Sequence, residues 1–143
     1  MNDKPHKNLI AWQMPMDLVV GIYETQDVFL SKNSTGSHLR RAAVSVPSNI
    51  AEGAAGRTMQ HFSNFLSNAI GSLNEIDTQL DLAHRLGYLA RQDYERLHRQ
   101  FDECVALTYG LRKSLASRSK GSQRQGTQKI DTSPENRIGE GPI

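Results

Sequence analysis

The side chains that could bind a metal ion or act as a nucleophile are five histidines and one cysteine, namely His6, His38, His61, His84, His98 and Cys104. Zinc proteases carry two histidines four residues apart around a glutamate, and structural zinc sites repeat closely spaced cysteine and histidine ligands. Neither pattern is present, so the sequence predicts no metal site, even where His84 and His98 approach each other between two helices. Because the sequence has a single cysteine, an internal disulfide is excluded. A chain without disulfides is typical of a reducing compartment. Cys104 falls on the apolar face of a predicted helix, where we expect a buried structural thiol and no nucleophile.

Carboxylates are the other candidates, because inward-facing glutamates and Glu-x-x-His pairs hold di-iron centres in helical bundles. Glu95 and His98 form one such pair, and Asp81 with His84 is its nearest equivalent. Both pairs fall close to a predicted turn, whereas Glu52 would lie roughly 30 Å away along the bundle at 1.5 Å per residue. Since these ligands cannot converge, we expect no di-iron centre. With no other motif of this kind in the sequence, we assign no cofactor and no catalytic residue.

The segment from Ser37 to Arg57 places polar side chains beside an apolar seam, where a bundle helix usually carries leucine. A buried polar group without a partner costs about 1–3 kcal/mol, so these side chains need one another. We predict a structural polar network in which Glu52 and Glu75 pair with Arg41 or Arg57. Its members are Arg41, Ser45, Asn49, Glu52, Arg57, Ser72, Glu75 and Gln79.

Gly53 and Gly56 suggest a phosphate loop, but no strand precedes them and no Gly-Lys-Ser or Gly-Lys-Thr follows. We expect both glycines to end a helix.

Four long segments carry apolar residues at every third or fourth position, which predicts four α-helices. We place them at about residues 8–30, 35–54, 58–86 and 90–117, the second beginning at Thr35 or Ser37. Pro15 leaves two alternatives for the first, a kinked helix from about Asn8 or a regular helix from about Met14. We favour the kinked helix, because the apolar phase continues across the proline. Pro47 predicts a bend in the second helix.

These elements predict an all-α fold, an antiparallel up-down-up-down four-helix bundle over residues 9–118. Residues 1–8 would form a flexible N-terminus, and residues 119–143 a disordered tail rich in Gly, Ser, Gln and Pro. The net charge of +2 does not by itself indicate nucleic-acid binding. No run approaches the ~18 apolar residues that cross a membrane, so we expect a soluble cytoplasmic protein.

Two stretches of the chain match a known pattern, LRRAAVSVPSNIAEG and the later AIGSLNEIDTQLDLAHRLGYL. Over about residues 9–115 the sequence resembles the four-helix-bundle family encoded in intervening sequences of bacterial 23S ribosomal RNA genes, often labelled S23 ribosomal protein. The matching residues are Arg41, Ala42, Ala43, Ser45, Asn49, Ile50, Glu52 and Gly53, followed by Gly71, Ser72, Leu73 and Glu75.

This resemblance implies a homopentameric ring with no established enzymatic activity. The sequence is also similar to accessory proteins of diversity-generating retroelements, which form basic pentameric barrels and bind nucleic acid and a reverse transcriptase. The S23 label reflects the position of the gene and does not imply a ribosomal subunit.

Two functional classes remain open, an RNA-associated or other nucleic-acid-binding oligomer and a protein-protein interaction scaffold that touches no nucleic acid. The first rests on basic side chains repeated around a ring, namely Arg40, Arg85, Arg91, Arg96, Arg99, Arg112 and Lys113. Against it, acidic residues such as Asp93 and Asp102 alternate with the fourth-helix arginines, as on an ordinary solvated helix face. We favour nucleic-acid binding because multivalency strengthens weak basic contacts.

Overall fold

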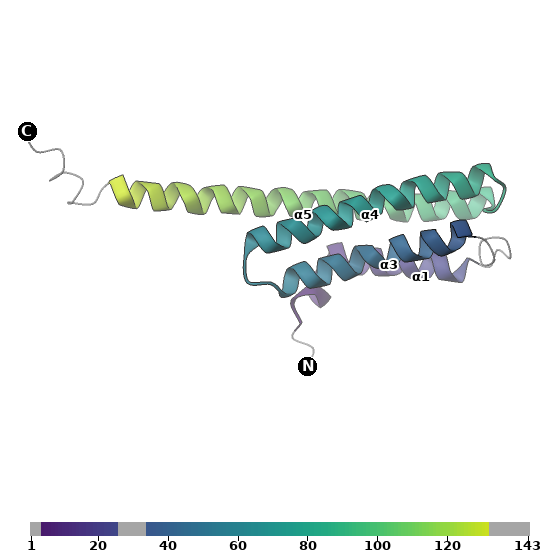
Figure 1. Cartoon of the computed structure of the whole chain (residues 1–143), viewed down its shortest axis with the longest axis horizontal. Helices are drawn as coiled ribbons and strands as arrows, with labels where there is room; N and C mark the ends of the chain where they lie inside the picture. Colours follow the sequence, from purple (N-terminus) through teal and green to yellow (C-terminus); the bar gives the residue numbers. More distant parts are fainter. Residues whose placement is uncertain (1–3, 26–33, 132–143) are drawn as a thin grey trace, which may run out of the picture.

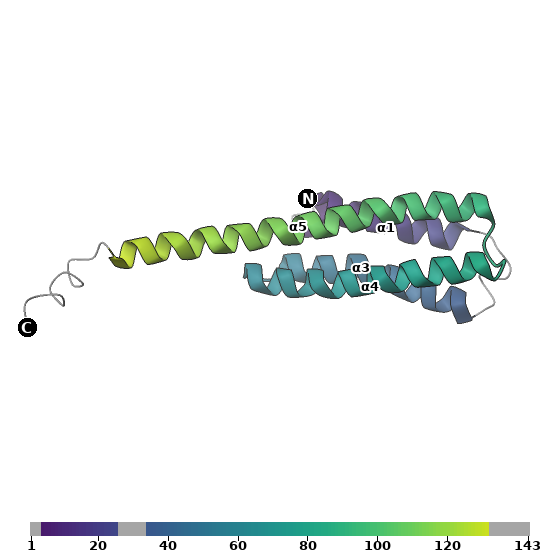
Figure 2. The same cartoon turned by 90° about the horizontal axis from the view of Figure 1, so that it is seen from above.

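The protein is an antiparallel bundle of four α-helices over residues 4–25 and 34–131, which are the residues that the computed structural model describes. The helices are α1 (Ile10–Glu24), α3 (Ser34–Ala55), α4 (Met59–Arg85) and α5 (Arg91–Asp131). Successive helices run in opposite directions, and no strand occurs within the described ranges (Figures 1 and 2). The predicted fold class is confirmed.

The first helix begins before Pro15, at Ile10, and this proline lies buried inside it. The alternative in which a regular helix starts near Met14 is therefore wrong, and the predicted extension to residue 30 falls partly on residues 26–33, outside the described ranges. Ahead of α1, where we expected a flexible segment, Pro5–Asn8 forms a short 3-10 helix. It is tied to α1 by a hydrogen bond from Gln13 Nε2 to the Lys7 carbonyl and by the edge-on packing of His6 against Trp12.

The ends of α4 follow the local signals of the sequence. Thr58 caps its start, because the Thr58 hydroxyl accepts a hydrogen bond from the His61 amide at 3.0 Å. Gly87 terminates it with a φ of +76°, the left-handed conformation that glycine adopts without steric cost. The amides of Tyr88 and Gly87 then donate to the carbonyls of Ala83 and His84, which forms a Schellman motif.

Gly53 has a different role from the predicted one. It lies buried inside α3, two residues before the helix ends at Ala55. A Cβ atom at Gly53 would meet Phe62 Cδ1 and Phe65 Cβ of α4, both at 2.9 Å. Gly53 therefore allows α3 and α4 to approach closely, and Gly56, the first residue after α3, is the glycine that stands at the helix end.

The last helix is longer than expected, since α5 continues to Asp131 through residues that the sequence predicts as the start of a disordered tail. Extending an existing helix adds one hydrogen bond per residue without a new nucleation step, and no proline interrupts the sequence before Pro134. Figure 1 shows the C-terminal part of α5 projecting beyond the other three helices. The rest of the predicted tail, residues 132–143, lies outside the described ranges.

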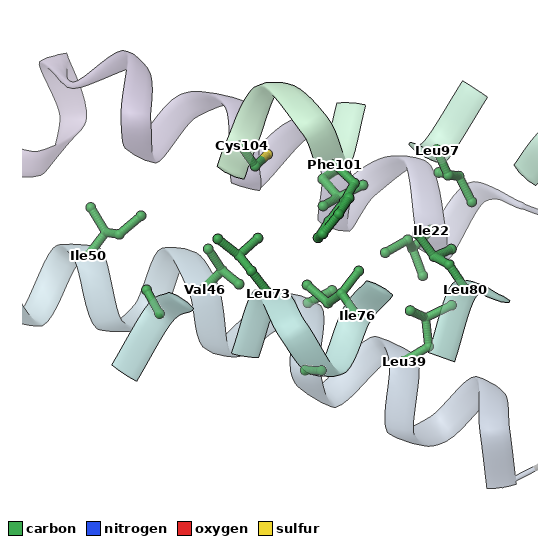
Figure 3. Packing of buried hydrophobic residues seen from close by; sticks show 14 of the residues in the cluster. Ile22, Leu39, Val46, Ile50, Leu73, Ile76, Leu80, Leu97, Phe101 and Cys104 are labelled. Carbon is green, nitrogen blue, oxygen red and sulfur yellow. The ribbon is translucent and has the colours of Figure 1, made fainter. Parts of the chain in front are cut away.

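The core is built from the apolar seams of all four helices, which meet along the bundle axis. Figure 3 shows Leu39, Val46 and Ile50 of α3 facing residues of α4 and α5. The fully buried side chains of the core also include Ile22, Leu73, Ile76, Leu80 and Leu97. Within the described ranges, no helix is both long enough and apolar enough to span a lipid bilayer.

Candidate nucleic-acid interface

The structure brings together three residues of the predicted polar network, at the contact between α3 and α4. The hydroxyls of Ser45 and Ser72 share a hydrogen bond of 2.8 Å between the two helices. Asn49 Nδ2 donates to the carbonyl and to the hydroxyl of Ser45, at 2.8 and 3.0 Å. This half-buried cluster joins the two helices that make the most extensive contact in the bundle.

The charged members of the network are not part of it. Arg41, Glu52, Arg57 and Glu75 are exposed, and none of them belongs to an ion pair among the residues of the described ranges. The buried-network hypothesis is wrong for these four residues, because their long side chains reach water, where a charge keeps its hydration. Gln79 is half-buried and lies with Glu75 along a shallow surface groove.

In the first half of α5, two of the predicted nucleic-acid-binding arginines are already engaged within the chain. Arg91 Nε pairs with Glu95 at 3.1 Å. Arg96 reaches both Asp93 and the buried Thr25 hydroxyl at the end of α1, at 3.3 and 3.2 Å. These two arginines fit the alternative to nucleic-acid binding, an ordinary solvated helix face on which basic side chains contact nearby acidic ones.

Three other predicted residues, Arg40, Arg85 and Arg99, belong to three different helices, α3, α4 and α5. Arg40 of α3 stacks its guanidinium over the Tyr23 ring at 5.1 Å, so part of this side chain is held against α1. Arg85 and Arg99 are exposed and belong to none of the ion pairs of the described residues.

The second half of α5 gathers the remaining candidates beside an aromatic ring. Arg112 stacks over the Tyr109 ring at 5.1 Å, and its Nη1 donates to the Ser67 hydroxyl of α4 at 3.4 Å. Arg112, Lys113 and Tyr109 line a shallow groove between α5 and α4, with Ser63 on the opposite wall. A half-exposed ring next to two cations is suited to stacking on a base while the cations contact phosphates.

The same helix carries basic residues that the sequence reading did not assign. Between Glu103 and Asp131 the sequence has no acidic residue, and its six basic residues there are Arg112, Lys113, Arg118, Lys120, Arg124 and Lys129. The net charge of +2 for the whole chain hides this run, because acidic residues elsewhere offset it. The signal that would have revealed it is the absence of aspartate and glutamate over this stretch.

Cys104 lies on the core face of α5 and is fully buried, as predicted. Burial raises the pKa of its thiol to about 12, and the nearby carboxylates of Glu103 and Asp17 act in the same direction. The thiolate is therefore strongly disfavoured.

The sequence and the fold both match known proteins. A family model described as 23S rRNA-intervening sequence protein matches residues 7–110. Among solved structures, the chain is similar to a protein of unknown function from the S23 ribosomal protein family of Bacteroides thetaiotaomicron VPI-5482. The TM-score is 0.67 at 23% identity, and the match covers 73% of this chain and 99% of the other. No curated protein matches the sequence.

Proposed function

Because the chain belongs to the 23S rRNA-intervening sequence protein family, we propose that it is a non-enzymatic, oligomeric RNA-associated protein that contacts phosphates through the distal half of α5. We define this basic segment as residues 104–130. The observation that carries the proposal is its charge, six basic residues without an acidic one, on a helix that projects from the bundle.

The basic segment is arranged to follow a phosphate backbone. Tyr109, Lys113 and Lys120 are separated by four and seven positions, intervals that keep them on one face of a helix. Met59 and Gln60 at the start of α4 line a groove with Leu115 and Lys120, so the residues beyond lie past the end of the neighbouring helix (Figure 2).

Self-assembly would multiply these contacts, and the homopentamer that the resemblance implies needs an apolar contact surface. Met16, Val20 and Tyr23 of α1 are 38–53% exposed and follow one another at intervals of four and three, on one helix face. Across the adjacent groove Val44 of α3 is 41% exposed. We name these four residues the apolar surface. Exposed apolar patches on otherwise polar proteins are typical of subunit contacts.

The proposal is tested by measuring RNA affinity against salt concentration, with light scattering on the same samples. A labelled mixed-sequence structured RNA should bind at low salt, and the logarithm of the affinity should fall linearly with the logarithm of the salt concentration. R112Q/K113Q should flatten that slope by roughly 2 per bound chain, since each lost phosphate contact lowers it by about 1. Light scattering should give a mass near five chains for both proteins.

A matched control is R85Q/R91Q, which removes the same charge outside the basic segment and should leave the slope close to that of the unmodified protein. Equal slopes for both double variants would contradict the assignment of the basic segment.

The apolar surface also supports the second candidate, a scaffold that binds another protein. A five-chain assembly that does not bind RNA at any salt concentration would favour the scaffold, because an apolar contact responds weakly to salt.

A further inference from the structure

We propose that Asp77 and Asp81 of α4 and His98 of α5 form a binding site for a divalent transition-metal ion. One ligand atom from each of these side chains lies within 4.8 Å of the other two. His98 lies in the first third of α5, before the basic segment, whose first cation is Arg112. It is independent of the proposed RNA binding.

The spacing of the ligand atoms suits a shared ion better than a direct hydrogen bond. His98 Nε2 lies 3.7 Å from Asp77 Oδ1, which is too long for a hydrogen bond. Two ligands bound at about 2.1 Å to a tetrahedral metal are roughly 3.4 Å apart, so small side-chain movements bring these atoms into a coordination sphere. The two aspartates are one helical turn apart, and both therefore face α5.

Two further side chains orient the proposed ligands from outside. The second imidazole nitrogen, His98 Nδ1, lies 3.2 Å from Asp102 Oδ2. A carboxylate at this position is the usual neighbour of a metal-binding imidazole, because it directs the other nitrogen toward the ion. The Tyr94 hydroxyl donates to Asp81 Oδ1 at 2.6 Å, which leaves Oδ2 available.

The kind of ion follows from the donor set. One imidazole nitrogen with two carboxylate oxygens suits zinc, manganese or ferrous iron, whereas magnesium and calcium prefer oxygen ligands alone. Three protein ligands leave at least one position for water. All donors project from two packed helices, so little order has to be gained on binding. The arrangement has no sequence motif, because its ligands come from two different helices.

The proposal is tested by calorimetric titration of the full chain with Zn²⁺, in a buffer that does not bind metal. We expect one Zn²⁺ per chain and, with Co²⁺ instead, visible absorption bands. H98Q and D77N/D81N should each weaken Zn²⁺ binding at least tenfold, and D102N should weaken it about tenfold, as loss of an orienting carboxylate does. Mg²⁺ at the same concentration should not compete.

The matched control is H38Q, which removes an exposed histidine of α3 and should bind Zn²⁺ like the unmodified protein. Circular dichroism establishes that each variant is folded, and since the altered side chains are at least partly exposed, we expect normal helix content. Zn²⁺ binding that survives in both H98Q and D77N/D81N, or no binding by the unmodified chain, would overturn the proposal.

Discussion

At the scale of single residues, Gly53 occupies a position in α3 where α4 leaves no room for a side chain. The two phenylalanines that a Cβ would meet belong to the first turns of α4, and the Phe65 ring lies 4.8 Å from the His61 ring. The Phe65 neighbour is a Cβ atom, which cannot move away without moving the backbone of α4. Any side chain at position 53 must therefore push the two helices apart.

We predict that G53A destabilises the protein by about 1–3 kcal/mol, as expected for overpacking. This loss should exceed the roughly 1 kcal/mol that alanine gains over glycine in a helix. Urea unfolding followed by circular dichroism measures the difference. G71A is the matched control, because Gly71 is exposed in α4 and an added Cβ meets nothing within 4 Å. It should stabilise by about 0.5–1 kcal/mol, and a G53A protein as stable as G71A would refute the close approach.

At the scale of whole elements, α5 divides along its length into a part that packs in the core and a part that projects from the bundle. Up to Leu115 it contributes buried side chains to the core, among them Leu97 and Phe101. From Ala116 to Gly121 the residues are exposed apart from the half-buried Ser119, and Gly121 has no neighbour within 4 Å of an added Cβ. The core therefore does not depend on the last turns of α5. The spacing between the basic residues, in contrast, requires that these turns are helical.

We predict that G121P shortens α5 without unfolding the bundle. A proline removes one helical hydrogen bond and clashes with the preceding turn, at a local cost of about 3 kcal/mol. Helical ellipticity should fall, while the free energy of unfolding of the bundle should change by less than about 0.5 kcal/mol, as for a surface site. G121A is the control and should keep the ellipticity. A lowered unfolding midpoint in G121P would indicate that the distal turns support the core.

At the scale of the whole molecule, acidic and basic side chains are mixed in one part of the bundle and separated in another. Asp77 and Asp81 of α4 and Asp102 of α5 lie among the arginines at positions 85, 91, 96 and 99, whereas the basic segment has no acidic residue. The small residues Ala42 and Ala43 of α3 are buried within the chain, so they are not available for contacts between chains. The proposed assembly would use exposed apolar residues instead, and the apolar surface is one such group.

We predict that V44E disrupts the assembly and leaves each chain folded. Val44 is exposed within the chain, so a glutamate there costs little in the separate subunit. A charge buried in a subunit contact without a partner is strongly unfavourable, so light scattering should give a mass near one chain with unchanged circular dichroism. A106E places the same charge on exposed Ala106 of α5 and should keep the mass. An unchanged mass in V44E would exclude this surface as the contact.

The residues that belong to local patterns could be placed from the sequence alone. The apolar seams, the Thr58 cap and the Gly87 stop depend on neighbours within one or two turns, so the four helices and their order were predictable. The sequence also placed Ser45, Asn49 and Ser72 beside the seams, and these are the members of the predicted network that the structure brings together.

Contacts between residues far apart in the chain depend on the tertiary structure. Side chains next to a seam can point to the core or to water, and helix rotation sends Arg41 and Glu52 to water although their positions resemble that of Ser45. The grouping of Asp77, Asp81 and His98, and the use of Gly53 for close packing, likewise depend on how two helices meet. Helical periodicity determines which face of each helix is apolar. The packing of side chains between helices determines which polar groups come together.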